Sequence, residues 1–176
     1  MIDGGRSDRS IMSDFYKGLK EKSVYFSQPV TYAPYTNSSM HAVFSGCYGI
    51  RTGTDSYWST YKFKKNQFKT ITEYFHDQDY YTFADIVNKI LIPKQGFDEF
   101  QIHDEQKDDL TLRHSELIEK TYTNNKNKNF FLYLQFSNIH TGISTEVLQV
   151  YDNFSEEYFQ NKKLNEKRYD KLFKKS

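Results

Sequence analysis

The spacing of hydrophobic residues along the chain predicts several helices. Apolar residues recur every four positions from Ile11 to Leu19, so residues 11–22 are expected to form a helix with one apolar face. A shorter helix is expected over residues 38–45. Gly46 directly follows it, and glycine readily adopts the left-handed backbone that ends a helix.

Two more helices and a helical tail are predicted farther along the chain. One helix begins near Thr70, because Thr70 and Glu73 have the spacing of a capping box, in which each side chain accepts a hydrogen bond from a backbone N–H of the other residue. Another covers residues 108–123, whose apolar residues fall on one helical face. Residues 145–176 are expected to form a charged helical tail.

The hydrophobic pattern also predicts strands. Residues 130–136, FFLYLQF, are the most apolar run, which is typical of a central strand covered on both faces. Shorter strands are expected over residues 80–84 and 24–26, and residues 1–2 are interpreted as the end of a strand. Alternating strands and helices favour an α/β fold with a mostly parallel sheet and helices on both faces. The length of 176 residues suits one domain, residues 1–176.

Composition narrows the class of protein. Hydrophobic residues make up 37% of the chain, but 18% of all residues are aromatic, so Phe and Tyr supply a core and general disorder is excluded. The net charge of +1 gives no overall attraction for nucleic acid, and the basic residues near the C-terminus alternate with acidic ones. No apolar run approaches the roughly 18 residues of a membrane span. We therefore expect neither a nucleic-acid partner nor a membrane segment.

Cysteine and most histidines suggest structural roles. Cys47 is the only cysteine, which excludes an internal disulfide and a cysteine-based zinc site. His76, His103 and His114 show no ligand spacing among themselves, and we interpret them as structural. His41 is expected to pack against its neighbours.

Three residues lie at positions where α/β proteins commonly carry catalytic or binding residues. Asp3 follows the first strand, His140 follows the apolar run of residues 130–136, and Thr36 precedes the short helix. The carboxyl ends of strands share one edge of an open sheet, and the free N–H groups at a helix N-terminus favour an anion. We therefore expect these three residues to form one site. Each also has a simpler interpretation, as a turn residue, a structural histidine or a helix cap respectively.

These residue types fit the transfer of a phosphoryl or sulfuryl group. The hydroxyl of Thr36 is a poor nucleophile at neutral pH until a base or a metal ion activates it. An ester anion repels an incoming oxyanion, and a divalent cation bound by Asp3 would neutralise both. His140 could donate a hydrogen bond to an oxygen of the transferred group.

Six blocks of sequence, in order over about residues 1–150, resemble the sulfatase family of the alkaline phosphatase superfamily. Three of them contain the candidate site: IDGGRSD after Met1, APYTNSSM from Ala33, and FFLYLQFSNIHT from Phe130. The other three are KTITEYF, YYT and GFDEF, at residues 69–75, 80–82 and 96–100. In the family, the first block holds a metal-binding aspartate, the second holds the nucleophile, and the last holds a histidine that contacts the transferred group.

The resemblance implies a sulfatase-like fold and a role for each matching residue. Asp3 matches a metal ligand, Thr36 the nucleophile, and His140 a contact to the sulfate or phosphate group. Asn37 and Arg51 are further candidates for substrate binding. The resemblance also implies a divalent ion, with Ca, Mg, Mn and Zn not distinguished, and an ester of a small molecule, glycan or lipid as the substrate.

Departures from the family pattern refine the expected substrate. Sulfatases convert a cysteine or serine at the nucleophile position into formylglycine, and Thr36 cannot undergo this change. Threonine is the nucleophile in branches of the superfamily that act on phosphoesters. Gly4 replaces the second aspartate of sulfatases, again as in those branches. A phosphate ester is therefore favoured over a sulfate ester.

The chain is expected to be the N-terminal part of a larger enzyme. The family's Asp-His-Gly or Asp-Asn-Gly segment, which supplies further metal ligands, has no counterpart after His140, so the C-terminal half of the domain is an expected partner. One aspartate alone does not hold a divalent ion tightly, so little turnover is expected of this chain by itself. The alternative is a catalytically inactive sulfatase-like module that binds a sugar or a protein through its aromatic surface.

Overall fold

The chain divides into two units, each described by itself. The computed structural model describes residues 1–10, 12–148 and 155–175. The first unit holds Met1 and residues 30–135, and the second holds residues 2–29 and 136–176. Among the described helices, none combines the length and apolar character that a bilayer crossing requires.

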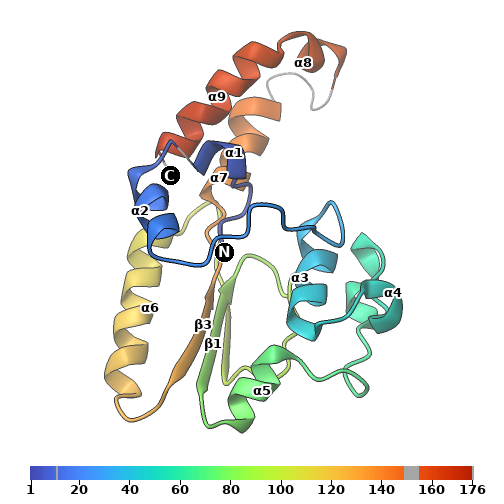
Figure 1. The fold of residues 1–176 in the computed structure, drawn as a ribbon, viewed down its shortest axis with the longest axis vertical. Helices are drawn as coiled ribbons and strands as arrows, with labels where there is room; N and C mark the ends of the chain where they lie inside the picture. Colours follow the sequence, from blue (N-terminus) through green and yellow to red (C-terminus); the bar gives the residue numbers. More distant parts are fainter. Residues whose placement is uncertain (11, 149–154, 176) are drawn as a thin grey trace. The chain divides into compact units, whose positions relative to one another are not determined.

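A sheet of three parallel strands forms the centre of the first unit (Figure 1). The strands are β1 (Tyr81–Ile86), β2 (Glu99–Ile102) and β3 (Phe130–Leu134), in the order β2-β1-β3. This confirms the expected α/β class with a parallel sheet.

The central strand is β1, and the prediction that residues 130–136 form the central strand was wrong. All residues of β1 after Tyr81 are buried, whereas no residue of β3 is fully buried. In the strand order β2-β1-β3, β3 lies at the edge of the sheet, and the terminal ammonium of Met1 donates a hydrogen bond to its Leu134 carbonyl at 2.7 Å. The residues of β3 are apolar because they pack against side chains of the neighbouring helices, although β3 does not lie between two strands of the sheet.

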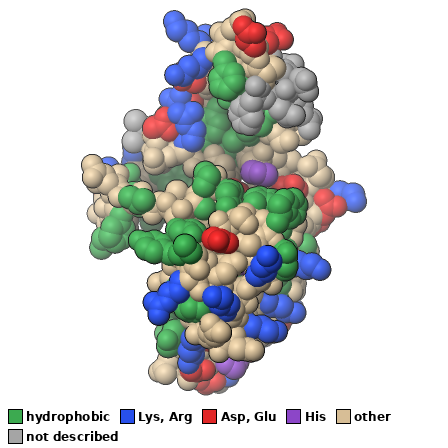
Figure 2. Space-filling model, turned by 90° about the vertical axis from the view of Figure 1, so that its right-hand side faces the viewer, with side chains coloured by type: hydrophobic (Ala, Val, Ile, Leu, Met, Phe, Trp, Pro, Cys, Tyr) green, Lys and Arg blue, Asp and Glu red, His purple; other side chains and the backbone are tan. Residues whose placement is uncertain are grey.

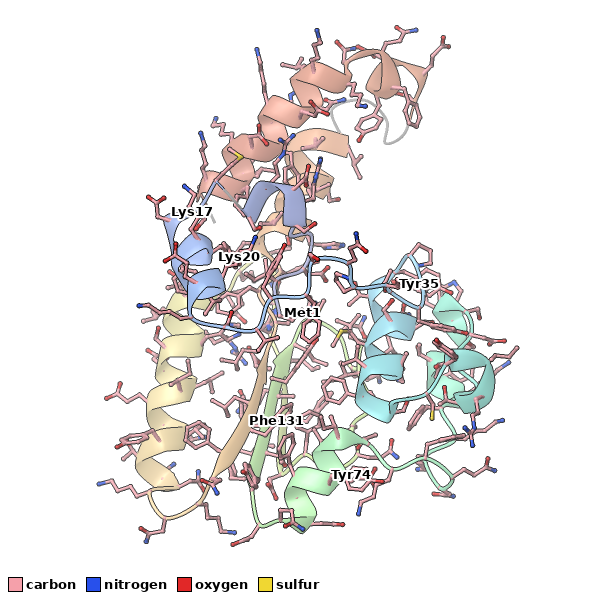
Figure 3. The ribbon with its side chains drawn as sticks, viewed as in Figure 1. Met1, Lys17, Lys20, Tyr35, Tyr74 and Phe131 are labelled. Carbon is pink, nitrogen blue, oxygen red and sulfur yellow. The ribbon has the colours of Figure 1, made fainter. Side chains whose placement is uncertain are left out.

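Side chains of β1 alternate between two differently packed faces. Ala84 and Ile86 lie in an apolar cluster with Phe44 of α3 (Thr36–Ser45), and β3 contributes Phe131 to the same face. The second helix on this face is α5 (Ile71–Asp77), whose Phe75 stacks on Phe131 with ring centroids 4.8 Å apart. Figure 3 shows Phe131 beside the labelled Tyr74 helix.

The opposite face of the sheet meets α6 (Leu110–Asn124) through polar contacts from Asp85. Helices therefore cover both faces, as expected. The first unit also contains two short helices, α4 (Gly49–Thr52) and the 3-10 helix η1 (Tyr57–Lys62).

Local signals correctly predicted the start of α5 and the end of α3. Thr70 caps α5 in a full capping box, with its backbone N–H donating to Glu73 Oε2 at 2.8 Å. Asp109 caps α6 by accepting from two backbone N–H groups. Helix α3 starts at Thr36, two residues earlier than predicted, and ends at Gly46, whose φ of 64° is left-handed.

The second unit is helical. Its elements are α1 (Ser7–Ser10), α2 (Asp14–Glu21), α7 (Asn138–Gly142), the π-helix η2 (Ile143–Leu148), α8 (Glu156–Gln160) and α9 (Lys162–Lys175). The charged helical character predicted for residues 145–176 is confirmed for the described part. Ile2 forms a parallel bridge with Phe136, so the first residues do end a short extended segment, as predicted.

Two predictions near the N-terminus differ from the structure. Residues 24–26 form no strand, and Val24 and Phe26 are 83% and 75% exposed. Three residues of high strand propensity have no neighbouring strand to pair with, so propensity alone does not order them. Ile11 lies outside the described residues, and the predicted apolar face of α2 is at the surface, with Phe15 72% exposed.

Gly96 provides a test of packing between α5 and the segment that leads into β2. Its φ is +75°, and a Cβ there would overlap the backbone nitrogen of Glu73. Gly46 has a similar φ of +64° but nothing within 4 Å of the Cβ position. We expect Gly46→Ala to lower the free energy of unfolding by about 1 kcal/mol, from backbone strain alone, and Gly96→Ala by about 3 kcal/mol or more. Urea denaturation measures both, and equal losses would contradict the described packing.

Candidate functional site

Thr36 is the first residue of α3 and is half-buried. The residue before it, Tyr35, is extended, with φ −139° and ψ 154°, and forms the N-cap. The first backbone N–H groups of a helix have no carbonyl partner within the helix, and the helix dipole favours negative charge at this end. In α3 the Ser38 N–H donates to Asn37 Oδ1 at 3.2 Å and is thus already used within the fold. The ten-residue helix thus presents the Thr36 segment where an anionic group would be stabilised.

The side chains that follow Thr36 hold the helix start in place. Asn37 is 1% exposed, and its Nδ2 donates to the Tyr57 carbonyl at 2.6 Å. Ser38 is fully buried and donates to the Ser56 carbonyl at 3.3 Å. These bonds connect the first turn of α3 to the start of η1. The amide of Asn37 is therefore used within the fold, and its role in substrate binding stays a prediction.

Two other residues near this segment have defined surroundings. His41 is 3% exposed and its ring lies 5.5 Å from that of Phe63, which agrees with the expected packing role. Burial lowers the pKa of His41, and a hydrogen bond with the Asn37 carbonyl opposes this shift. Arg51 of α4 is exposed, with its guanidinium 5.7 Å from the centre of the Phe68 ring. Substrate binding by Arg51 stays a prediction.

Asp3 and His140 belong to adjacent segments of the second unit. The Asp3 N–H donates to the Phe136 carbonyl at 2.8 Å, and Gly4 follows with a φ of +77°. A Cβ on Gly4 would lie 3.0 Å from the backbone nitrogen of His140, a tight contact, and the positive φ at this position favours glycine. The Tyr169 hydroxyl donates to the Gly4 carbonyl at 2.7 Å and holds the turn.

The structure therefore brings two of the three predicted site residues into neighbouring segments. Asp3 follows the bridge to Phe136, and His140 lies in α7 with its side chain exposed. Thr36 belongs to the first unit, so a site that joins all three residues stays a prediction.

A second group of polar residues lies buried within the first unit. Asp85 is near the end of β1, His103 directly follows β2, and His114 lies on α6. Asp85 Oδ2 is 3.0 Å from His103 Nδ1 and 2.9 Å from His114 Nε2. All three ligand atoms lie within 4.8 Å of one another, so this group could hold a metal ion.

Without a metal ion, the Asp85 carboxylate is paired with the guanidinium of Arg113. Its Nε donates to Asp85 Oδ2 at 3.0 Å and its Nη2 to Oδ1 at 2.9 Å, while Nη2 also donates to Gln101 at 3.1 Å. Burial by itself would raise the pKa of Asp85, but the hydrogen bonds from His103, His114 and Arg113 outweigh it and hold the pKa well below its usual value. The carboxylate is thus charged and already paired, and a cation would compete with the guanidinium for it.

Sequence reasoning missed this group because its members come from three separate elements. Two signals could have found it. Asp85 interrupts the apolar strand sequence TFADI, and a buried carboxylate requires partners. His114 lies four residues after Leu110 and three before Leu117, which places it on the apolar face of the predicted helix.

Comparisons with known proteins add no family to this description. No family model, curated protein or solved structure matches the chain. The sulfatase resemblance therefore remains an expectation from sequence motifs.

Replacing Asp85 should test the buried group directly. Asp85→Asn places an amide donor where several donors converge and removes the closest counter-charge of Arg113. We expect the free energy of unfolding to fall by about 3–5 kcal/mol, as for other broken buried pairs. The control is Asp108→Asn, which removes a partly exposed partner 3.6 Å from Arg113 and should cost less than about 1 kcal/mol. Urea denaturation measures the free energy of unfolding of both variants. Similar losses would contradict the conclusion that Asp85 contributes more to stability than Asp108 does.

The depressed pKa of Asp85 also predicts a pH dependence. An unfolded aspartate titrates near about 3.9, and the folded pKa lies below that. The stabilisation by the charged group is therefore complete above pH of about 5 and is lost as the pH falls through the folded pKa. We expect the difference in unfolding free energy between the wild type and Asp85→Asn to shrink as the pH falls below about 4. A difference that instead grows over this acidic range would contradict a depressed pKa of Asp85.

Proposed function

We propose that this chain carries part of the active site of a metal-dependent hydrolase or transferase that acts on phosphate or sulfate esters, with Thr36 as the nucleophile. The observation that supports it most is the position of Thr36 at the N-terminus of α3, where backbone N–H groups favour an anionic group. The close approach of the Asp3 turn to the His140 segment supplies the second support.

The proposed reaction begins when the Thr36 oxygen attacks the phosphorus or sulfur atom. The hydroxyl proton of Thr36 passes to solvent as its oxygen bonds to the phosphorus or sulfur atom. The bond to the ester oxygen breaks at the same time, and that oxygen takes up a proton from solvent as it leaves. The covalent threonine ester then passes its group to water or to an acceptor hydroxyl. The N-terminal N–H groups of α3 stabilise the negative charge that develops on the transferred group.

Asp3 and His140 have distinct roles in this proposal. A carboxylate is the hard oxygen ligand that a divalent cation prefers, and the half-buried Asp3 in the turn after Ile2 would supply one. When bound, a divalent ion would offset the charge of the ester and of the attacking oxygen. His140 is exposed on α7 and can donate a hydrogen bond to an oxygen of the transferred group.

Substitution of Thr36 tests the proposal. The full-length gene product is assayed on an aryl phosphate, a phosphodiester and an aryl sulfate, with Mg, Ca, Mn and Zn ions added in turn. We expect Thr36→Ala to lower kcat by about 1,000-fold or more, because the nucleophile is absent, and Thr36→Ser to keep part of the activity, because it keeps a hydroxyl. Trapped intermediate should carry the phosphoryl group on residue 36.

Two results would remove this proposal. Unchanged turnover in Thr36→Ala would exclude the residue as nucleophile. A wild-type protein that turns over no ester with any of these ions would favour the non-catalytic binding module.

A further inference from the structure

We propose that the Asp85 group binds a zinc-type transition-metal ion, and that the guanidinium of Arg113 pairs with Asp85 until the ion displaces it. The three ligand atoms are Asp85 Oδ2, His103 Nδ1 and His114 Nε2. None of these residues lies in a sequence block that resembles the sulfatase family. The ion is therefore distinct from the divalent ion that the proposed reaction assigns to Asp3, and the two proposals are tested independently.

The three ligand atoms already have nearly the spacing of a tetrahedral zinc site. Asp85 Oδ2 lies 3.0 Å from His103 Nδ1 and 2.9 Å from His114 Nε2, and all three atoms lie within 4.8 Å of one another. Zinc bonds of about 2.0–2.1 Å place tetrahedral ligand atoms about 3.3 Å apart. The two distances from Asp85 are slightly shorter than this, so small shifts of the side chains would admit the ion.

Three nitrogen atoms converge on one oxygen of Asp85. Besides the two imidazole nitrogens, Arg113 Nε donates to Oδ2 at 3.0 Å, while Arg113 Nη2 donates to Oδ1 at 2.9 Å. A carboxylate oxygen has two lone pairs, so three donors are more than it accepts with good geometry. A cation in place of the imidazole protons removes this crowding, because it accepts lone pairs from the oxygen and from both nitrogens.

The ligands lie where open parallel sheets commonly bind their ligands, at the carboxyl ends of the strands. Asp85 precedes the last residue of β1, and His103 directly follows β2. The backbone N–H of His103 donates to the Ile86 carbonyl at 3.0 Å, which holds it beside β1. His114 belongs to α6, which Figure 1 draws alongside the strands. Ligands that are held in place before binding lose little conformational entropy when the ion arrives.

Arg113 is the member of the group that has room to move. The side chains of Asp85 and His103 are fully buried and that of His114 is 2% exposed, but that of Arg113 is 27% exposed. Asp108 Oδ2 lies 3.6 Å from Arg113 Nη1, so the guanidinium keeps an acidic partner when it leaves Asp85. A divalent ion together with the guanidinium would place three positive charges beside one buried carboxylate, which desolvation disfavours. The ion and the guanidinium therefore exclude each other.

The donor atoms select the class of ion. Two imidazole nitrogens and one carboxylate oxygen suit Zn²⁺ and neighbouring transition metals, whereas Mg²⁺ and Ca²⁺ prefer oxygen ligands. Three protein ligands leave a fourth position of a tetrahedron, and the departing guanidinium makes room for a water there. Imidazole binds a metal through a lone pair, so the proton on each ligating nitrogen moves to the other ring nitrogen or to solvent.

Metal titration of the wild-type chain is the first test. The full chain is prepared without a polyhistidine tag, stripped with EDTA and dialysed, and Zn²⁺, Mg²⁺ and Ca²⁺ are then titrated by calorimetry. We expect one Zn²⁺ site from which an excess of Mg²⁺ or Ca²⁺ of about tenfold does not displace the ion. Co²⁺ in this site should show the visible absorption of a four-coordinate ion with nitrogen ligands. No zinc binding, or equal affinity for Mg²⁺, would overturn the proposal.

Two variants within the group have opposite expected effects. His103→Gln removes a ligand nitrogen and should weaken zinc binding about 100-fold or more. Arg113→Gln should tighten zinc binding about tenfold, because the charge-assisted hydrogen bonds to Asp85 no longer have to be broken. In EDTA, Arg113→Gln should also have a lower thermal midpoint than the wild type, and zinc should raise its midpoint by more, since an ion that binds the folded chain stabilises it.

Histidines at the surface are the alternative source of zinc binding. Figure 2 shows histidine over only a small part of the face that it draws. His76 is 54% exposed in its side chain and lies 3.3 Å from Asp98, so it offers an exposed histidine and carboxylate pair. His76→Gln is therefore the matched control and should leave the zinc affinity unchanged. Equal losses in His76→Gln and His103→Gln would show adventitious binding and overturn the proposal.

The sign of the Arg113→Gln effect separates the proposed site from a purely structural group. Unchanged or weaker zinc binding in Arg113→Gln would show that the guanidinium does not compete with an ion, and would overturn the proposal. If His103→Gln does not fold, this sign and the Co²⁺ spectrum of the wild type still decide. Neither measurement depends on ester turnover, so the role of Thr36 stands or falls separately.

Discussion

The buried charge of Asp85 is the constraint on which the first unit depends. A carboxylate in the central strand costs several kcal/mol unless hydrogen bonds and an opposite charge compensate it. Its partners come from α6, through Arg113 and His114, and from the residue after β2, His103. Because these bonds are directional, they favour one position of α6 on the sheet, whereas an apolar contact would tolerate several.

The two faces of the sheet are therefore stabilised in different ways. On the face that carries α3 and α5, aromatic rings fill the space, with Phe44, Phe97 and Phe131 in contact around the apolar residues of β1. Such packing is favourable because it removes apolar area from water, and it depends on shape more than on direction. The α6 face relies on the polar group instead. Packing on the α3 and α5 face thus tolerates small shifts of the helices, whereas the hydrogen bonds on the other face fix the position of α6 on the sheet.

Local chemistry explains which parts of the fold could be predicted from the sequence. The capping box at Thr70 and the left-handed Gly46 depend on interactions within a few residues, so their signals are complete in the sequence. The order of strands depends on partners distant in sequence, and the apolar run of β3 therefore gave the wrong central strand. Residues 24–26 show the same limit, because a strand needs a neighbour that propensity does not supply.

The candidate site was predictable to a similar degree. The closeness of Asp3 to His140 follows from the meeting of parallel strand ends at one edge of the sheet, which is a general rule of α/β folds. The start of α3 was predicted two residues too late, because its N-cap is Tyr35, which makes no side-chain cap hydrogen bond and so leaves no local signal. To predict that Asp85, His103 and His114 lie together, one must know the register of β1 with β2 and the rotation of α6 about its axis. Neither can be inferred from a few neighbouring residues in the sequence.

Helix α3 links the sheet to the proposed chemistry. Phe44, near its C-terminal end, packs in the apolar cluster, while Asn37 and Ser38 bind the start of η1 from its first turn. The same rigid helix thus carries Thr36 and orders Tyr57 and Trp58 beside it.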